Sequence, residues 1–463
     1  MAYINQGDDA VERLDNAVTA FEQIMTGPEG QTVAVPGHQP QPTLAERVKQ
    51  NLKPSTDAAA GFATQAAASA KAADDAAKLA SQISGLEDVS DAVALAALPL
   101  PDVWAPLSDS LRMITGYGRD VLVGSDVVAR MVNFSRSTTK TYQGKDGLQK
   151  TAAVNEATFG IGGCLVDGQS TNVVPFYDNF SSYTSKPTVT TPESDGFTVF
   201  DLDQVAYTGS ASSLTVGAMY TISALVDVSG PCVMRIGFGG QNRDVTISAA
   251  MRGVISLSAN CASNAGALCR IGPTSRDAGV RVRVRYLQLE ALPFASSPIP
   301  TTGAAVTRAA DAIQIPYAGN GVPLSDMQMT MSAVIKANTV PGVPVALLDA
   351  LDITPNVGVF LSDAGFISVR VFDASWNPGI TPDMTKEQVV ALSFNGATGA
   401  VAMRVGDKVV TGSIVVPKGI SRSAGNIGLL CRSGTNTRTG FGSVRDFKIW
   451  HKFFTVDQLK AIK

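Results

Sequence analysis

Alanine dominates the stretch from residue 57 to residue 86, and nothing that breaks a helix lies between Phe62 and Gln82. Small or apolar residues recur at alternating steps of four and three, the heptad spacing of a coiled coil: Phe62, Ala66, Ser69, Ala73, Ala76, Ala80 and Ile83. A neighbouring phase of alanines fits equally well, so the register stays open. A helix with a stripe of methyl groups buries little by itself, because isolated helices are marginal in water. The stretch therefore predicts an α-helical coiled-coil stalk that joins copies of the chain, with a flexible Ala-rich linker as the alternative.

A second seam, with bulkier side chains, precedes the stalk. Between residues 8 and 26, apolar residues again follow the three-four spacing: Val11, Leu14, Val18, Phe21 and Met25. Asp8 and Asp9 favour the start of a helix, and Gly27 with Pro28 ends it. Such a helix can pack in a bundle of copies or against a foreign surface.

The segment between the two helical stretches, residues 27–42, contains four prolines and few apolar residues. It predicts an extended segment that lies against a partner. Thr43 and Glu46 form a capping box for a short helix to Leu52, which Pro54 should stop. This arrangement predicts an attachment module, and a flexible N-terminal tail is the alternative.

The composition favours strands and turns over a large helical enzyme. The 463 residues include 43 glycines and 24 prolines, while aromatic residues make up only 6%. A net charge of −3 and a pI near 5.6 provide no field that attracts nucleic acid or an anionic membrane.

The start of the chain lacks the basic and apolar regions of a secretory signal, and the longest apolar run, near residues 93–100, is too short to span a bilayer. The cysteines are odd in number and lack metal-binding spacing: Cys164, Cys232, Cys261, Cys269 and Cys431. They predict reduced, mostly buried thiols, although a Cys261–Cys269 pair stays open. We expect synthesis in a reducing cytosol.

An antiparallel β pattern extends from about residue 172 to residue 298, and its clearest strand covers residues 280–290. Valines occupy one face of this strand and Arg281, Arg283 and Arg285 the other. The phase changes at Tyr286, as a β-bulge or a strand passing between two buried faces requires. Frequent strands without helices predict a β-sandwich. The arginines could meet an acidic sugar or phosphate; alternatively they form a solvated face or pair with carboxylates of the next strand.

Alternating strands continue from about Asp311 to the end of the chain. A hairpin is expected at Gly406-Asp407, because that pair suits a two-residue turn. A last strand over residues 444–450 precedes a short helix, for which Thr455 and Gln458 form a capping box.

The best sugar-binding candidate in this region is the turn at residues 373–379. Trp376 offers an aromatic platform, and Asn377 and Asp373 offer hydrogen-bonding groups beside it. The alternative is that Trp376 anchors the loop by packing.

Four segments, in order, resemble parts of tailed-bacteriophage tail-fibre proteins. Residues 287–311 resemble the QLE strand and the IPT-to-VTRAAD connector that join a jelly roll to a concanavalin-like, laminin-G-type domain in that family. Three other segments resemble its preceding strands and turns: residues 134–142, 147–156 and 165–172. The chain departs from the family at Ala157-Thr158, where Pro-Arg is usual, and at Asp167, where Glu is usual.

The resemblance implies a homotrimeric virion fibre that is mainly β, with an N-terminal α-helical coiled-coil stalk and two antiparallel β-sandwiches. Its expected parts are a virion-attachment region (1–54), an Ala-rich coiled-coil stalk (55–95), a proline-stiffened joint and β lead-in (96–165), a jelly-roll carbohydrate-binding-like domain (166–305) and a concanavalin-like lectin domain (306–463). The implied partners are further copies of the chain, a tail, baseplate or collar protein at residues 1–54, and a host polysaccharide or lipopolysaccharide. The resemblance carries no catalytic residue, metal or cofactor onto this chain.

The residues themselves offer little for catalysis. His38 and His451 are the only histidines, and neither has a nucleophile motif to serve. The long repeated β-helix typical of glycan-cleaving spikes is not evident. We therefore expect a non-enzymatic, receptor-binding tail fibre in the virion. A structural collar whisker or connector fibre is the alternative, and a glycan-degrading tailspike is a third hypothesis.

Overall fold

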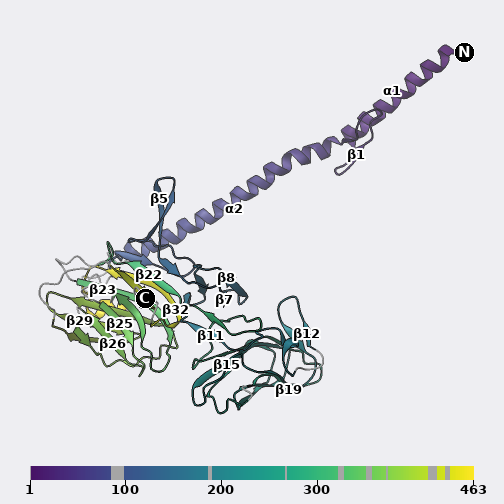
Figure 1. Cartoon of the computed structure of the whole chain (residues 1–463). Helices are drawn as coiled ribbons and strands as arrows, with labels where there is room; N and C mark the ends of the chain where they lie inside the picture. Colours follow the sequence, from purple (N-terminus) through teal and green to yellow (C-terminus); the bar gives the residue numbers. More distant parts are fainter. Residues whose placement is uncertain are drawn as a thin grey trace. The chain divides into compact units, whose positions relative to one another are not determined.

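The computed structural model describes residues 2–84, 98–185, 190–265, 268–321, 328–350, 357–371, 374–415, 425–432 and 438–463. The chain separates into two compact units, Met1–Leu95 (unit 1) and Ala96–Lys463 (unit 2) (Figure 1). The described part of unit 1, residues 2–84, is helical apart from one small hairpin and the turns beside it, whereas unit 2 is built mainly from antiparallel sheets. The prediction of a mainly β chain is confirmed.

Unit 1 contains two long helices, α1 (Ala2–Thr26) and α2 (Leu44–Ser84). Helix α1 ends before Gly27-Pro28 as predicted, but it begins earlier than Asp8. The expectation that Pro54 stops a short helix is wrong, because α2 passes through this residue without interruption. A proline inside a helix removes one hydrogen bond and costs about 3 kcal/mol. The capped first turn and the alanine-rich continuation outweigh that local cost.

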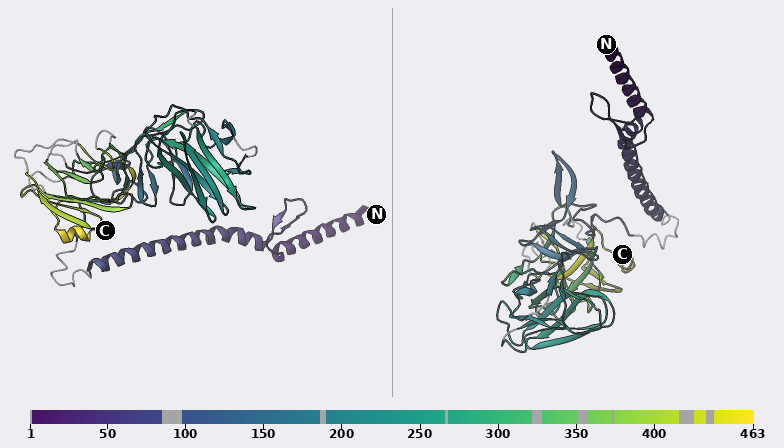
Figure 2. Two further views of the ribbon diagram at one scale, coloured as in Figure 1. Left: turned by 90° about the horizontal axis from the view of Figure 1, so that it is seen from below. Right: turned by 90° about the vertical axis from the view of Figure 1, so that its right-hand side faces the viewer.

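The segment that connects α1 to α2 folds into a hairpin beside the two helices (Figure 2), in place of the expected extended segment. Its strands β1 (Thr32–Val33) and β2 (Gln41–Pro42) pair antiparallel, and Val33 is buried. Only half of the predicted capping box forms: the Thr43 hydroxyl accepts from Glu46 N at 3.2 Å. The Glu46 carboxylate instead accepts from Gly30 N at 2.8 Å and so ties the hairpin to α2.

The apolar seam of α1 (the α1 seam: Val11, Leu14, Val18, Phe21 and Met25) is exposed along its length. Its five side chains keep 66%, 66%, 47%, 63% and 47% of their surface in contact with solvent. In the stalk seam, Ala66 and Ser69 are also exposed. The side chains of Phe62, Ala73, Ala76, Ala80 and Ile83 lie outside the described residues, although their backbone is helical. The coiled coil and its register stay predictions.

The smaller sandwich of unit 2 has a five-stranded and a four-stranded sheet. The first contains β12 (Thr190–Pro192), β13 (Thr198–Phe200), β20 (Val282–Glu290), β15 (Met219–Val228) and β18 (Met251–Asn260). The second contains β14 (Ala206–Thr208), β19 (Cys269–Arg276), β16 (Cys232–Phe238) and β17 (Gln241–Ile247). From β13 to β20 the strands pair in a nested order: β13 with β20, β14 with β19, β15 with β18, and β16 with β17. A long hairpin rolled into two sheets in this way is a jelly roll.

The β-bulge predicted near Tyr286 is present in β20. Leu225 pairs with Tyr286 and Val226 with Val284, which leaves Arg285 as the extra residue. The bulge changes which residues of β20 face the core: before it Val282 and Val284 are buried, and after it Leu287 and Leu289 are.

The larger sandwich of unit 2 has an eight-stranded and a seven-stranded sheet. The first contains β30 (Lys408–Ser413), β29 (Ala400–Val405), β28 (Gln388–Asn395), β23 (Gln328–Asn338), β32 (Phe441–Trp450), β10 (Gly163–Val166), β9 (Thr158–Gly160) and β3 (Val103–Ala105). The second contains β27 (Ala374–Trp376), β26 (Ile367–Val371), β25 (Val357–Leu361), β24 (Val345–Ala350), β31 (Asn426–Leu429), β22 (Ala312–Pro316) and β6 (Asn133–Ser135).

The stretch expected to be a joint and lead-in (96–165) supplies β3, β6, β9 and β10 to the larger sandwich. The jelly roll is therefore inserted between strands of one larger domain. Strands β11 (Ser170–Asn172) and β21 (Val306–Arg308) pair antiparallel where the chain enters and leaves the jelly roll. Two further hairpins, β4–β5 (Arg119–Val123, Asp126–Met131) and β7–β8 (Lys140–Gln143, Gln149–Ala152), extend from the early part of unit 2.

Two local predictions near the C-terminus are confirmed. Strands β29 and β30 pair through a two-residue turn at Gly406-Asp407, where Gly406 has a φ of 59°. Helix α4 (Val456–Ala461) has the complete capping box of Thr455 and Gln458.

All five cysteines are buried thiols that form no disulfide, including Cys261 and Cys269. Burial raises the pKa of Cys164, Cys269 and Cys431 to about 12. At about pH 8, only about one part in ten thousand of each is the reactive thiolate. We expect iodoacetamide to leave these three residues unmodified in native protein and to alkylate them in guanidinium, as mapped by mass spectrometry. Rapid labelling of any of the three in the native state would contradict their burial.

Candidate functional site

The arginine face of β20 is largely paired with carboxylates, one of the alternatives left open by the sequence. Arg283 contacts Glu193 and Asp195, each at 2.8 Å, and also Asp227. Arg281 forms an ion pair with Glu193 as well. These contacts place two of the three arginines in a network of salt bridges on the outer face of the jelly roll.

Arg285 has a different environment because the bulge places it at the end of this network. Its guanidinium lies 5.7 Å from the ring centre of Phe197, and that of Arg252 from β18 lies 5.0 Å from the same ring. Phe197 is fully buried beneath them. The guanidinium of Arg283 lies 4.7 Å from the same ring centre, so Phe197 holds three guanidiniums by cation–π attraction.

The best sugar-binding candidate predicted from the sequence, the turn at residues 373–379, has a packed tryptophan. Trp376, at the end of β27, lies over Gly412 of β30, where an added Cβ would approach the indole to 2.6 Å. The Asn377 side chain accepts from Gly379 N at 2.9 Å and so closes the turn. Asp373 lies outside the described residues. Sugar binding by these residues stays a prediction.

A cleft of about 850 Å³ lies between the jelly roll and the larger sandwich (the basic cleft). Its basic side chains come from both sandwiches and from the β7–β8 turn: Lys145, Arg252, Arg285, Lys336 and Lys386. Its acidic side chains are Asp167 and Glu387. Of the three arginines predicted from the sequence, Arg285 alone lines the cleft. This cleft is the candidate functional site.

Two basic residues of the cleft, Arg252 and Lys336, were not predicted from the sequence. Lys336 had a signal in the sequence, because it is the one charged residue in the strand that became β23. Arg252 had no such signal in the sequence. It lies near Arg285 because β15 pairs with β18 on one side and with β20 on the other.

The segments that resemble tail-fibre proteins meet in a buried cluster of charges beside this cleft (the ionic junction: Arg136, Lys140, Asp167, Arg308 and Asp311). Asp311 contacts Arg136 at 3.0 Å and Lys140 at 2.6 Å, and its carboxylate also accepts from Asp167 N at 2.8 Å. Lys140 contacts the Asp167 carboxylate at 2.8 Å. Every one of these side chains is at least nine-tenths buried.

Burial alone would raise the pKa of Asp167, but Arg308 and Lys140 outweigh it and hold that pKa well below its ordinary range. Asp167 therefore stays ionised between its cations. Next to it, buried Glu290 of the QLE strand accepts from Ser170 Oγ and Gln288 Nε2, each at 2.6 Å. The resembling segments thus fix the passage of the chain between the sandwiches. Some of their residues, among them Gln149 and Asp167, also line the cleft.

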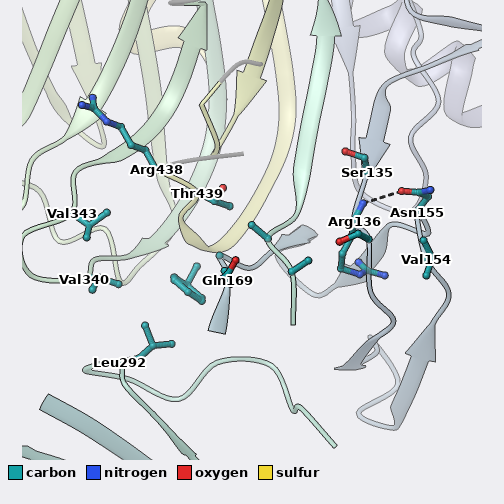
Figure 3. Close-up of a pocket in the computed structure, with 15 residues that line it drawn as sticks. Ser135, Arg136, Val154, Asn155, Gln169, Leu292, Val340, Val343, Arg438 and Thr439 are labelled. Atoms are coloured by element: carbon teal, nitrogen blue, oxygen red, sulfur yellow. Dashed lines mark hydrogen bonds between the residues drawn. The ribbon is translucent and has the colours of Figure 1, made fainter. Parts of the chain in front are cut away.

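A second cavity of about 860 Å³ opens near the junction (Figure 3). Valines line one part of it, and Asn155 accepts from Arg136 N at 3.0 Å in another. Phe441 borders both this cavity and the basic cleft. The lining of this second cavity has two exposed amides, Asn155 and Gln169, and its charged side chains are Arg136 and Arg438. It therefore gathers fewer charges than the basic cleft.

Within the described residues, no three His, Cys, Asp or Glu side chains gather in a group that could hold a metal ion. None of the helices in the described part of the chain is both long and apolar enough to cross a membrane.

The fold and the cleft define a β protein of two antiparallel sandwiches, one inserted into the other and joined by a buried ionic junction. No protein-family model matches the chain, and no curated protein sequence matches it.

Among solved structures, a pentraxin of Limulus polyphemus has a TM-score of 0.24 and 13% identity, over 29% of this chain and 69% of the pentraxin. The NanB sialidase of Streptococcus pneumoniae has a TM-score of 0.26 and 14% identity, over 32% of this chain and 26% of the sialidase. The binding domain of botulinum neurotoxin serotype D has a TM-score of 0.18 and 8% identity, over 70% of this chain and 97% of the binding domain. At TM-scores this low, the likenesses carry no argument about function.

Proposed function

We propose that the chain is a non-enzymatic tail-fibre protein of a tailed bacteriophage. In this role residues 1–54 attach the fibre to a tail, baseplate or collar protein, and unit 2 recognises a glycan on the host surface. The ordered resemblance over four segments supports the family, since residues of all four meet in one buried junction or beside it. The location of the protein is then the virion, after synthesis in the host cytoplasm.

The observation that carries the proposal is the exposure of the α1 seam. Five large apolar side chains on one face of a helix are rarely left in water, and such a stripe marks an interaction surface. Copies of the chain are the simplest cover, because the same three-four spacing continues in the stalk. A homotrimer with a coiled-coil stalk follows, as the family resemblance implies.

A second exposed apolar surface supports association of the copies. The β4–β5 hairpin exposes four aliphatic side chains near its tip: Leu122, Val123, Val127 and Val128. An isolated two-stranded hairpin is at best marginally stable in water, so contacts with further copies would stabilise it.

The purified full chain should bind at least one polysaccharide in a panel of bacterial capsules and lipopolysaccharides, and it should release no reducing ends. Binding is measured by biolayer interferometry and cleavage by a reducing-end assay. Self-association with no glycan bound would favour the structural whisker or connector fibre. Release of reducing ends would favour the degrading spike. Electron cryo-microscopy of the particle would then place the fibre on the tail or the collar.

A further inference from the structure

We propose that the basic cleft binds an anionic sugar unit, whose carboxylate or phosphate is held by Arg252, Arg285 and Lys336. This inference rests on the proposed glycan-binding function and names the chemical class of the ligand and the place where it binds.

The charges of the cleft are unbalanced. Its two carboxylates are already engaged, since Asp167 belongs to the ionic junction and Glu387 contacts Arg445 at 2.9 Å. Two of its lysines also have partners: Lys145 pairs with Asp109, and Lys386 lies 3.5 Å from Asp383. Within the described residues, no carboxylate forms an ion pair with Arg252, Arg285 or Lys336. The surplus of positive charge faces the cleft.

The two arginines are held in place before a ligand arrives. Both guanidiniums rest on the buried ring of Phe197 together with that of Arg283. The nearby carboxylates Glu193, Asp195 and Asp227 form their ion pairs with Arg283. A planar guanidinium offers paired donors that match a carboxylate or a phosphate. Because the stack limits their movement, less conformational entropy is lost when they bind.

The cleft also offers groups for sugar hydroxyls. Gln149 donates to the Tyr177 hydroxyl at 2.8 Å, while its carbonyl oxygen is buried without a protein partner among the described residues. An acceptor without a donor is unfavourable, and a ligand hydroxyl that reached it from the cleft would satisfy it. The side chains of Asn338 and Thr385 also line the cleft.

The same observations disfavour a nucleic acid. The two aromatic residues that line the basic cleft, Tyr286 and Phe441, are only 4% and 6% exposed, so they offer no stacking platform for bases. The net charge of −3 also opposes binding of a polyanion along the surface. A single anionic group on a hydroxyl-rich ligand fits better.

Two cleft variants of the full chain, Lys336→Glu and the double variant Arg252→Ala/Arg285→Ala, test this inference. The matched control is Lys408→Glu, because Lys408 is an exposed lysine on the same sheet as Lys336 but outside the cleft. The probes are bacterial polysaccharides with neutral, carboxylated and phosphorylated members, measured by biolayer interferometry at two salt concentrations. Lys336 is exposed, so its replacement leaves the fold intact even if the double variant unfolds.

We expect wild-type protein to prefer carboxylated or phosphorylated members, and each cleft variant to weaken that binding at least about tenfold. The Lys408→Glu control should bind like the wild type, and the preferred member distinguishes a carboxylate from a phosphate. Acidic polysaccharides that bind the cleft variants as well as the control would overturn the assignment of the cleft. Binding to neutral polysaccharides alone would overturn the anionic class and leave the proposed function intact. If no polysaccharide binds, the proposed function itself fails.

Discussion

Replacing Asp311 with alanine will destabilise unit 2 by about 3–5 kcal/mol, because it leaves Arg136 and Lys140 as buried charges without their shared partner. Asp311 is fully buried and contacts those cations at 3.0 and 2.6 Å. Denaturation of the full chain in guanidinium, followed by tryptophan fluorescence, measures the loss. All three tryptophans, Trp104, Trp376 and Trp450, lie in unit 2, so the signal reports on that unit alone.

The control for this prediction is Asp109→Ala. Asp109 also pairs with a lysine, but its side chain is 72% exposed. Removing an exposed ion pair changes stability by about 1 kcal/mol or less. If Asp311→Ala destabilised the protein no more than Asp109→Ala, the junction would not hold the sandwiches together as described.

Replacing Phe21 with aspartate in the α1 seam will convert the proposed homotrimer to single chains. Phe21 is 63% exposed in one chain and lies midway between Val18 and Met25 on the seam. In a bundle of copies, the new carboxylates would face one another in an apolar interface, where burial of an unpaired charge is strongly unfavourable. Sedimentation equilibrium should show a fall from three times the chain mass to the single-chain mass of 48.1 kDa.

Asn16→Asp adds the same charge to α1 on the face opposite the seam, and this variant should keep the mass of the wild type. A wild-type full chain that sediments as a monomer would contradict the fibre proposal itself. Dissociation by Asn16→Asp to the same extent would show that charge on α1, rather than its seam, governs association.

Several local features could be predicted from the sequence because neighbouring residues determine them. The three-four spacing predicted helix α1, and the change of phase at Tyr286 predicted the bulge in β20. The capping pair Thr455 and Gln458 predicted the start of α4. Each of these depends on backbone geometry and side chains within a few residues, which spacing alone reveals.

The candidate site could be predicted only in part. The arginine face of β20 was evident, but the sequence did not show which arginine would remain without a carboxylate. Glu193 and Asp227, which pair with Arg283, lie 90 and 56 residues away from it in the chain. Their distances depend on the rolling of the jelly-roll strands, which no local pattern encodes.

The sequence by itself therefore determined the mainly β character, the apolar seam of α1 and the turns, because these follow from local periodicity and conformational preference. Only the tertiary structure decided that β3, β6, β9 and β10 join the larger sandwich, that the jelly roll is an insertion, and that the basic cleft lies between them. Arg136 and Asp311 are 175 residues apart in the chain, yet their charges meet in the junction. Pairing over such a distance is selected by the burial of whole sheets and charges, which emerges only when the complete chain packs.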